Sequence, residues 1–144
     1  VADANPSTRL AYGYDTPGGH IDGETGEIMP SLGAFGLTCA TFVLEVLDSC
    51  GYKLVNLKSW PKALKDDIKW QEKMVKQFLN RPDISQEAID RQEKNFGKSR
   101  YLPEQIATST QVKTPATRGS VLKPAQKIRK ELKAHFARLK KPSS

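Results

Sequence analysis

The chain has 144 residues, 38% of them hydrophobic, and carries 23 Lys and Arg against 16 Asp and Glu, a formal net charge of +7. This length suits one domain with its own core, and no apolar run approaches the roughly 20 residues of a membrane-spanning helix. Residues 1–111 hold 13 basic and 15 acidic side chains, a net of −2, whereas residues 112–144 hold 10 and one, a net of +9. This uneven charge argues against a uniformly basic, nucleic-acid-binding fold.

Short extended segments separated by turns are predicted before residue 36. Apolar alternation indicates strands near 10–14, at 20–21 and near 27–29, with Gly- and Asp-containing turns between them. His20, Asp22 and Glu24 alternate and would share one face of a strand, but one imidazole without a thiolate is a poor zinc set. A solvated hairpin is the favoured interpretation, so the sequence predicts no metal site and no cofactor.

The most apolar stretch predicts a buried helix that starts at Thr38 and stops at Gly51. A threonine hydroxyl can accept a hydrogen bond from the first turn, and a glycine can adopt the left-handed geometry that ends a helix. One apolar stripe is expected to face the core, widened by Ala40 and Leu44. The stripe consists of Phe42, Val43, Val46, Leu47 and Cys50.

The two cysteines of this helix are expected to differ. Cys39 lies in the first turn, where the helix dipole and the free N–H groups favour a thiolate and could stabilise an oxyanion; the competing interpretation is a small buried hydrophobe. Cys50 is predicted to be core. The two are roughly 16 Å apart along a helix, too far for a disulfide, which suits a reducing, cytoplasmic compartment.

After this helix, residues 52–57 predict one more strand, and helical periodicity returns at 61–80, 83–95 and 103–107. The expected fold is therefore α+β and dominated by helices, with the Cys-bearing helix packed on a small antiparallel sheet. Residues 1–107 form the predicted domain, and residues 108–123 resemble a linker, rich in Thr, Ser, Gln, Pro and Gly without periodicity.

Residues 124–144 are predicted to be either a basic amphipathic helix or a disordered tail. One side would be apolar, through Ala125, Ile128, Leu132, His135, Phe136 and Leu139. The remaining surface supplies the candidate anion-binding residues Lys127, Arg129, Lys130, Lys133, Arg138, Lys140 and Lys141. An anionic membrane surface, a nucleic acid or an acidic protein groove would suit such a helix. If 108–123 is a linker, removal of residues 112–144 should leave the domain stable.

The run GLTCATFVLEVLDSCGY, residues 36–52, resembles the papain-like cysteine hydrolases of the NlpC-type superfamily. It is most similar to their circularly permuted bacterial members, in which a Cys-Ala/Ser-Thr-Phe-Val run opens the main helix. The resemblance covers about residues 31–57. It implies a peptidase, amidase or acyltransferase, with Cys39 as the nucleophile and Thr41, Phe42 and Val43 in the helix behind it.

The same resemblance implies a histidine base on a strand that precedes the cysteine. His20 is the only histidine before Cys39. Because its Gly-rich setting matches the family poorly, the preferred expectation is that the chain is a fragment and that the base is encoded upstream of Val1.

Two functions are therefore considered. One is thiol-dependent hydrolysis or acyl transfer at an amide or ester bond, and the other is non-catalytic binding of an anionic partner through the C-terminal segment.

Overall fold

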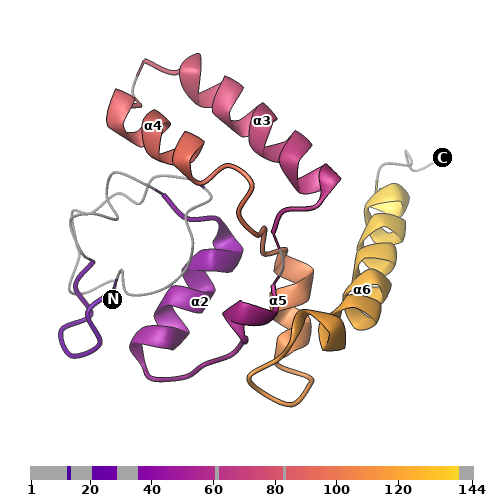
Figure 1. Cartoon of the computed structure of the whole chain (residues 1–144). Helices are drawn as coiled ribbons and strands as arrows, with labels where there is room; N and C mark the ends of the chain where they lie inside the picture. Colours follow the sequence, from indigo (N-terminus) through magenta and orange to yellow (C-terminus); the bar gives the residue numbers. More distant parts are fainter. Residues whose placement is uncertain (1–12, 14–20, 29–35, 61, 83, 140–144) are drawn as a thin grey trace.

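The computed structural model describes residues 13, 21–28, 36–60, 62–82 and 84–139. These residues form a series of helices joined by short connections (Figure 1). In chain order they are α2 (Cys39–Ser49), the 3-10 turn η1 (Leu57–Ser59), α3 (Lys65–Leu79), α4 (Gln86–Lys94), α5 (Pro103–Ser109) and α6 (Arg118–Leu139). The strands expected at 10–14 and at His20 lie outside the described residues.

The predicted antiparallel sheet is wrong for the part of the chain that the structure describes, which contains helices and two isolated β-bridges. Ile21 pairs with Ile28 across a tight turn, and Val55 pairs with Ala116 in parallel. Around the second bridge, the Ala116 N–H donates to the Leu54 carbonyl and the Asn56 N–H donates to the Ala116 carbonyl, each at 2.9 Å. Of the apolar residues at 52–57, Leu54 and Val55 are buried, whereas Tyr52 is 49% and Leu57 40% exposed, so the predicted strand is reduced to the single bridge at Val55.

The ends of α2 follow the prediction. The Thr38 hydroxyl accepts the Thr41 N–H at 3.2 Å, and the Thr38 N–H donates to the Thr41 hydroxyl at 2.9 Å. At the other end Gly51 has a φ of +76°, and its N–H donates to the Asp48 carbonyl while that of Tyr52 donates to Leu47. This pair of bonds is the Schellman arrangement, which needs a residue that tolerates positive φ.

The predicted buried face of α2 is wrong in part. Its buried residues are Ala40, Thr41, Leu44 and Glu45, whereas Val43 is 44% exposed and the predicted core residue Cys50 is exposed. Thr41, Glu45 and Asp48 lie on one side of this helix, and yet Thr41 and Glu45 are 3% and 1% exposed, so contacts with the rest of the fold rather than periodicity decide which face is buried. Ala40 and Leu44, which were expected to widen the apolar stripe, are buried as predicted, and Leu47 packs against the core.

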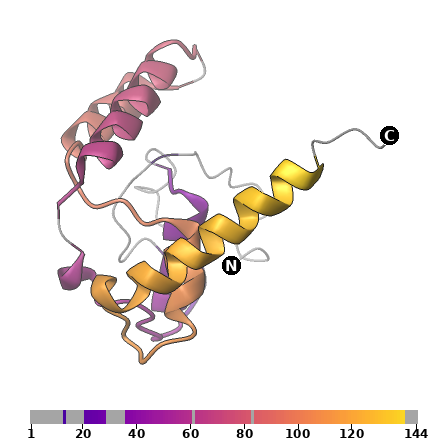
Figure 2. The ribbon, with the colours of Figure 1, turned by 90° about the vertical axis from the view of Figure 1, so that its right-hand side faces the viewer.

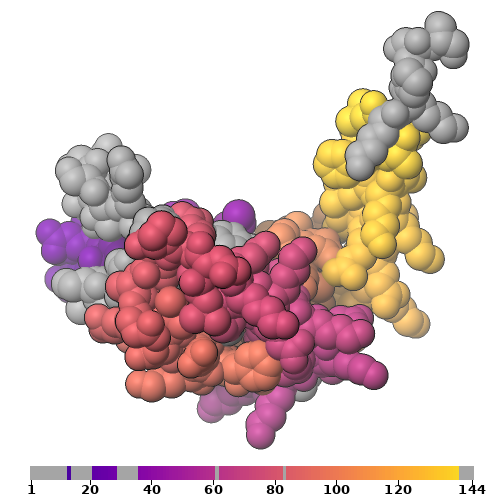
Figure 3. Space-filling model, turned by 90° about the horizontal axis from the view of Figure 1, so that it is seen from above, coloured from indigo at the N-terminus to yellow at the C-terminus, as the bar shows by residue number. Residues whose placement is uncertain are grey.

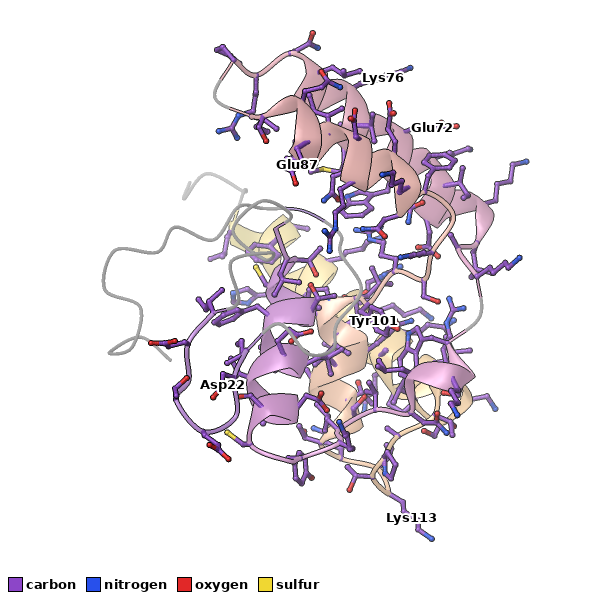
Figure 4. All side chains as sticks on the ribbon, turned by 60° about the vertical axis from the view of Figure 1, so that its left-hand side comes forward. Asp22, Glu72, Lys76, Glu87, Tyr101 and Lys113 are labelled. Carbon is purple, nitrogen blue, oxygen red and sulfur yellow. The ribbon has the colours of Figure 1, made fainter. Side chains whose placement is uncertain are left out.

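The core lies where α2, α5 and the first half of α6 meet. Trp60 and Tyr101 pack at its edge with ring centroids 5.5 Å apart, and Figure 4 shows Tyr101 within the body, beside α5. Burial raises the pKa of the Tyr101 hydroxyl above its ordinary value. The buried cluster comprises Ala40, Leu44, Leu54, Val55, Trp60, Tyr101, Ile106, Ala116 and Val121.

Helices α3 and α4 form an antiparallel pair at one side of the molecule (Figures 1 and 2). Gln71, which is 1% exposed, ties α3 to the chain after α4: its side-chain amide donates to the Lys98 carbonyl at 3.0 Å and accepts the Gly97 N–H at 2.9 Å. The outer side of α3 carries charged residues such as Glu72 and Lys76 (Figure 4). The predicted short helix at Pro103 is present as α5, with the proline in its first turn.

Residues 108–123, expected to be a linker, are packed. Thr108 and Ser109 are fully buried at the end of α5, and Ala116 and Val121 have no exposed surface. Helix α6 already begins at Arg118, whose N–H donates to the Ser59 hydroxyl at 3.1 Å. A run of small polar residues without periodicity is therefore a tight, ordered connection here.

Candidate functional site

Cys39 lies in the first turn of α2, as predicted, and it is exposed. Cys50 follows the last turn of the same helix and is also exposed, so the two free thiols lie at opposite ends of α2. Exposure makes Cys39 accessible to a substrate or an alkylating reagent, but it does not set Cys39 apart from Cys50. Position relative to the helix dipole is what distinguishes them.

A cysteine nucleophile also needs a base within hydrogen-bond reach. His20, the in-chain candidate, lies outside the described residues, and the described imidazole is that of His135 near the end of α6. That ring contacts Phe136 edge to face, with centroids 5.9 Å apart. The start of α2 and the end of α6 stand apart in Figures 1 and 2. Within the described chain, Cys39 is therefore not brought to a histidine.

The hairpin over residues 21–28 uses its acidic residue to build a turn. The Asp22 carboxylate accepts N–H groups from Glu24 at 2.9 Å and Thr25 at 2.7 Å. The Thr25 N–H, followed by the Thr25 hydroxyl, lowers the pKa of Asp22 below its ordinary value. Among the described residues, no group of three or more His, Cys, Asp or Glu side chains could hold a metal ion. The structure thus gives Asp22 a local role in the turn.

The first half of α6 is docked on the core. Val121 is fully buried and Ala125 is 4% exposed. Arg129 then reaches α5, where its Nε donates to the Glu104 carboxylate at 2.6 Å and a second guanidinium N–H bonds the same oxygen. Glu104 is only 14% exposed, so this ion pair sits at the edge of the packed α5–α6 contact.

The second half of α6 is uncovered. Each residue from Glu131 to Leu139 is exposed, including three large apolar side chains: Leu132 at 48%, Phe136 at 57% and Leu139 at 67%. They lie four and three residues apart and therefore share one face of the helix. In Figure 3 the yellow end of α6 projects away from α3 and α4. Unlike scattered surface leucines, these residues form an aligned apolar strip.

Basic residues surround that strip. The predicted anion-binding residues Lys127, Arg129, Lys130, Lys133 and Arg138 are exposed on α6, while Lys140 and Lys141 lie outside the described residues. Glu131 is the one acidic residue from 112 to 144. We call Leu132, Phe136 and Leu139 with Lys130, Lys133 and Arg138 the distal α6 surface.

Sequence reasoning missed two surface clefts, because each combines residues far apart in the chain. A mostly apolar cleft of about 320 Å³ lies between the end of α2 and the chain that follows; it includes Leu44, Tyr52, Leu54, Leu57 and Pro115. A wider, shallower one lies beside Trp60 and includes Lys58, Lys62, Phe96, Lys98 and Tyr101. Neither of these two clefts includes Cys39 or residues of α6, whereas another of about 330 Å³ is lined by residues of α5 and α6, including Glu104, Ala125 and Arg129.

In the described part of the chain, every helix is too short or too polar to cross a membrane. Comparison of the chain with protein-family models, with curated proteins and with solved structures finds no match. The functional assignment therefore depends on the geometry of the chain itself.

Proposed function

We propose that this chain is a non-catalytic binding protein that captures an anionic partner through the distal α6 surface. The observation that carries the proposal is the change of exposure along α6. An apolar strip that is buried at Ala125 continues uncovered through Leu132, Phe136 and Leu139, with lysine and arginine beside it. Basic residues attract an anionic partner over several ångströms, and the apolar strip supplies area that association would bury.

The charge distribution supports the same proposal. A net charge of +9 over residues 112–144 stands against −2 for the rest of the chain, so the attractive field is concentrated around α6. We include a cytoplasmic location in this proposal, since both thiols are free and exposed and exposed thiols persist in a reducing compartment.

Thiol-dependent hydrolysis or acyl transfer stays a prediction that stands on the resemblance of residues 36–52 and on the exposed first-turn position of Cys39. This function requires the Cys39 thiol to react faster than the Cys50 thiol. Iodoacetamide should then label Cys39 well ahead of Cys50, and Cys39→Ser, but not Cys50→Ser, should abolish hydrolysis of a nitrophenyl ester. Equal labelling of both thiols would count against it.

The binding proposal is tested with three anionic probes: vesicles of equal phosphatidylserine and phosphatidylcholine, mixed-sequence duplex DNA, and polyglutamate. At least one should bind the full chain, more weakly as salt rises. The double variant Lys130→Glu/Lys133→Glu should weaken that binding at least about tenfold, because it reverses two of the positive charges that surround the distal half of α6.

The matched control is Lys69→Glu/Lys73→Glu, which makes the same charge change at two exposed positions of α3. Since the altered side chains are exposed, each variant should keep the wild-type melting temperature. Equal losses in the two double variants would mean that net charge, not α6, governs binding. Absence of binding to every probe, and to an acidic amphipathic helical peptide, would overturn the proposal.

A further inference from the structure

The apolar strip of α6 is one continuous face with two environments. Residues 121, 125, 128, 132, 136 and 139 follow one another at intervals of three or four, which keeps them on one side of a helix. Val121 and Ala125 on that side are buried, and Ile128 is half-buried. The uncovered half therefore points toward the same side as the core, not away from it.

This orientation excludes a flat partner. A bilayer laid along Leu132, Phe136 and Leu139 would continue along the strip into α5, which lies against the first half of the same face. Figure 2 shows α6 crossing α5 with its first half and extending beyond it with its last turns. A membrane-bound amphipathic helix needs its whole apolar face free to lie in the interface, and here only the last turns could reach one.

A nucleic acid would leave the strip unused. Phosphate contacts need lysine and arginine, and these are spread around α6 at Lys127, Lys130, Lys133 and Arg138. The three apolar side chains would stay in water in such a complex. An occupant that covers the strip must bring apolar groups of its own and be narrow enough to stand beside α5.

The α5–α6 contact within the chain shows how such an occupant can pack. Helix α5 covers the strip with apolar side chains such as Ile106, which is 4% exposed, and places Glu104 against Arg129 at the border. One turn further along α6, Lys133 stands four residues after Arg129 and is exposed. A second helix placed in line with α5 would meet Leu132 and Phe136 with its apolar face and Lys133 with a carboxylate.

From this geometry we infer that the partner is an acidic amphipathic helix of another protein, which docks on the distal α6 surface and continues the packing of α5. This inference rests on the proposed function and names its partner class. It requires leucine-like residues three and four positions apart, flanked by Asp or Glu. A second copy of this chain is a poor occupant through α6, because two basic helices would be brought together.

The test uses the full chain and a synthetic helical peptide of three heptads with leucine at the a and d positions and glutamate at e and g. We expect binding in the micromolar range, at least about tenfold tighter than to phosphatidylserine vesicles or duplex DNA. A peptide of the same charge with serine in place of leucine should bind at least about tenfold more weakly. Phe136→Glu should cause a similar loss.

The matched control is Leu79→Glu, since Leu79 on α3 is as exposed as Phe136, 57% in both cases, and the charge change is identical. If Leu79→Glu weakens binding as much, the peptide recognises charge alone and the inference fails. If vesicles or DNA bind as tightly as the peptide and depend on α6, the binding proposal stands but its partner class is wrong. Sedimentation that shows a dimer broken by Phe136→Glu would assign the strip to self-association and overturn the inference.

Discussion

The two halves of α6 have similar sequences and opposite environments. Both follow the same apolar spacing and both carry basic side chains. In the first half, Val121 and Ala125 are at most 4% exposed, whereas in the second half Leu132, Phe136 and Leu139 are 48% or more exposed. The difference lies in the neighbour: the first turn of α5, at Glu104, meets α6 at Arg129, so α5 covers the first half of α6 and does not reach the second half.

This comparison separates what a helical pattern encodes from what a fold provides. Periodicity predicts that a helix has an apolar face, but a buried face needs a second element at the right place. In α6 one face serves two purposes, stability near its start and, as we propose, recognition near its end.

The largest effect should come from removing the whole segment. A chain that ends at residue 111 lacks Ala116 and Val121, which have no exposed surface, and uncovers the core around Val55 and Ile106. Uncovering several apolar side chains costs about 5 kcal/mol or more at roughly 1.5–3 kcal/mol each, comparable to the whole stability of a small domain. The truncated chain should therefore lose its cooperative unfolding transition in calorimetry.

The matched control is a chain that ends at residue 130, which loses only the uncovered half. Its melting temperature should change by less than about 3 °C, because the missing residues contact little of the body. This outcome differs from the sequence-based expectation, in which all of 112–144 was removable. A stable chain that ends at residue 111 would restore the linker interpretation and contradict the packed connection.

Single substitutions sharpen the same division. Val121→Asp places a carboxylate where no surface is exposed and should destabilise the fold by about 3–5 kcal/mol. Phe136→Asp makes the same kind of change at a position that is 57% exposed and should alter the free energy of unfolding by at most about 0.5 kcal/mol. Urea denaturation measures both values. A large loss from Phe136→Asp would show that the distal strip is already covered within the chain.

Local chemistry explains which parts of the fold could be predicted. The cap at Thr38, the stop at Gly51 and the start of α5 at Pro103 depend on residues within a few positions of each other. Such signals are contained in a short stretch of sequence. The helical state of 124–139 was one of two predicted alternatives and follows from its spacing in the same way.

Contacts between distant residues explain what could not be predicted. Gln71 is buried because it bonds the backbone of Gly97 and Lys98, which are 26 and 27 residues away, and no spacing rule links these positions. The buried face of α2 and the packed segment around Ala116 depend in the same way on elements that arrive later in the chain. The candidate surface divides likewise: its residues were predicted, but the half of the strip that stays uncovered depends on where α5 begins, at Pro103, because Glu104 meets α6 at Arg129.

The smallest effect concerns the ion pair at the border between the two halves of α6. Arg129 and Glu104 have side chains that are 49% and 14% exposed, and two N–H groups of the guanidinium bond one carboxylate oxygen. A double-mutant cycle with Arg129→Ala and Glu104→Ala should give a coupling of about 0.5–1.5 kcal/mol, since partial burial strengthens a charge-assisted bond. The Lys53–Asp48 pair, with side chains 67% and 30% exposed, is the control and should couple by at most about 0.5 kcal/mol.

Equal coupling energies in the two cycles would mean that the Arg129–Glu104 pair adds nothing beyond an ordinary surface contact. The docking of α6 would then depend chiefly on its buried apolar residues such as Val121 and Ala125, and a partner carboxylate at Lys133 would contribute to the rate and specificity of association more than to its strength.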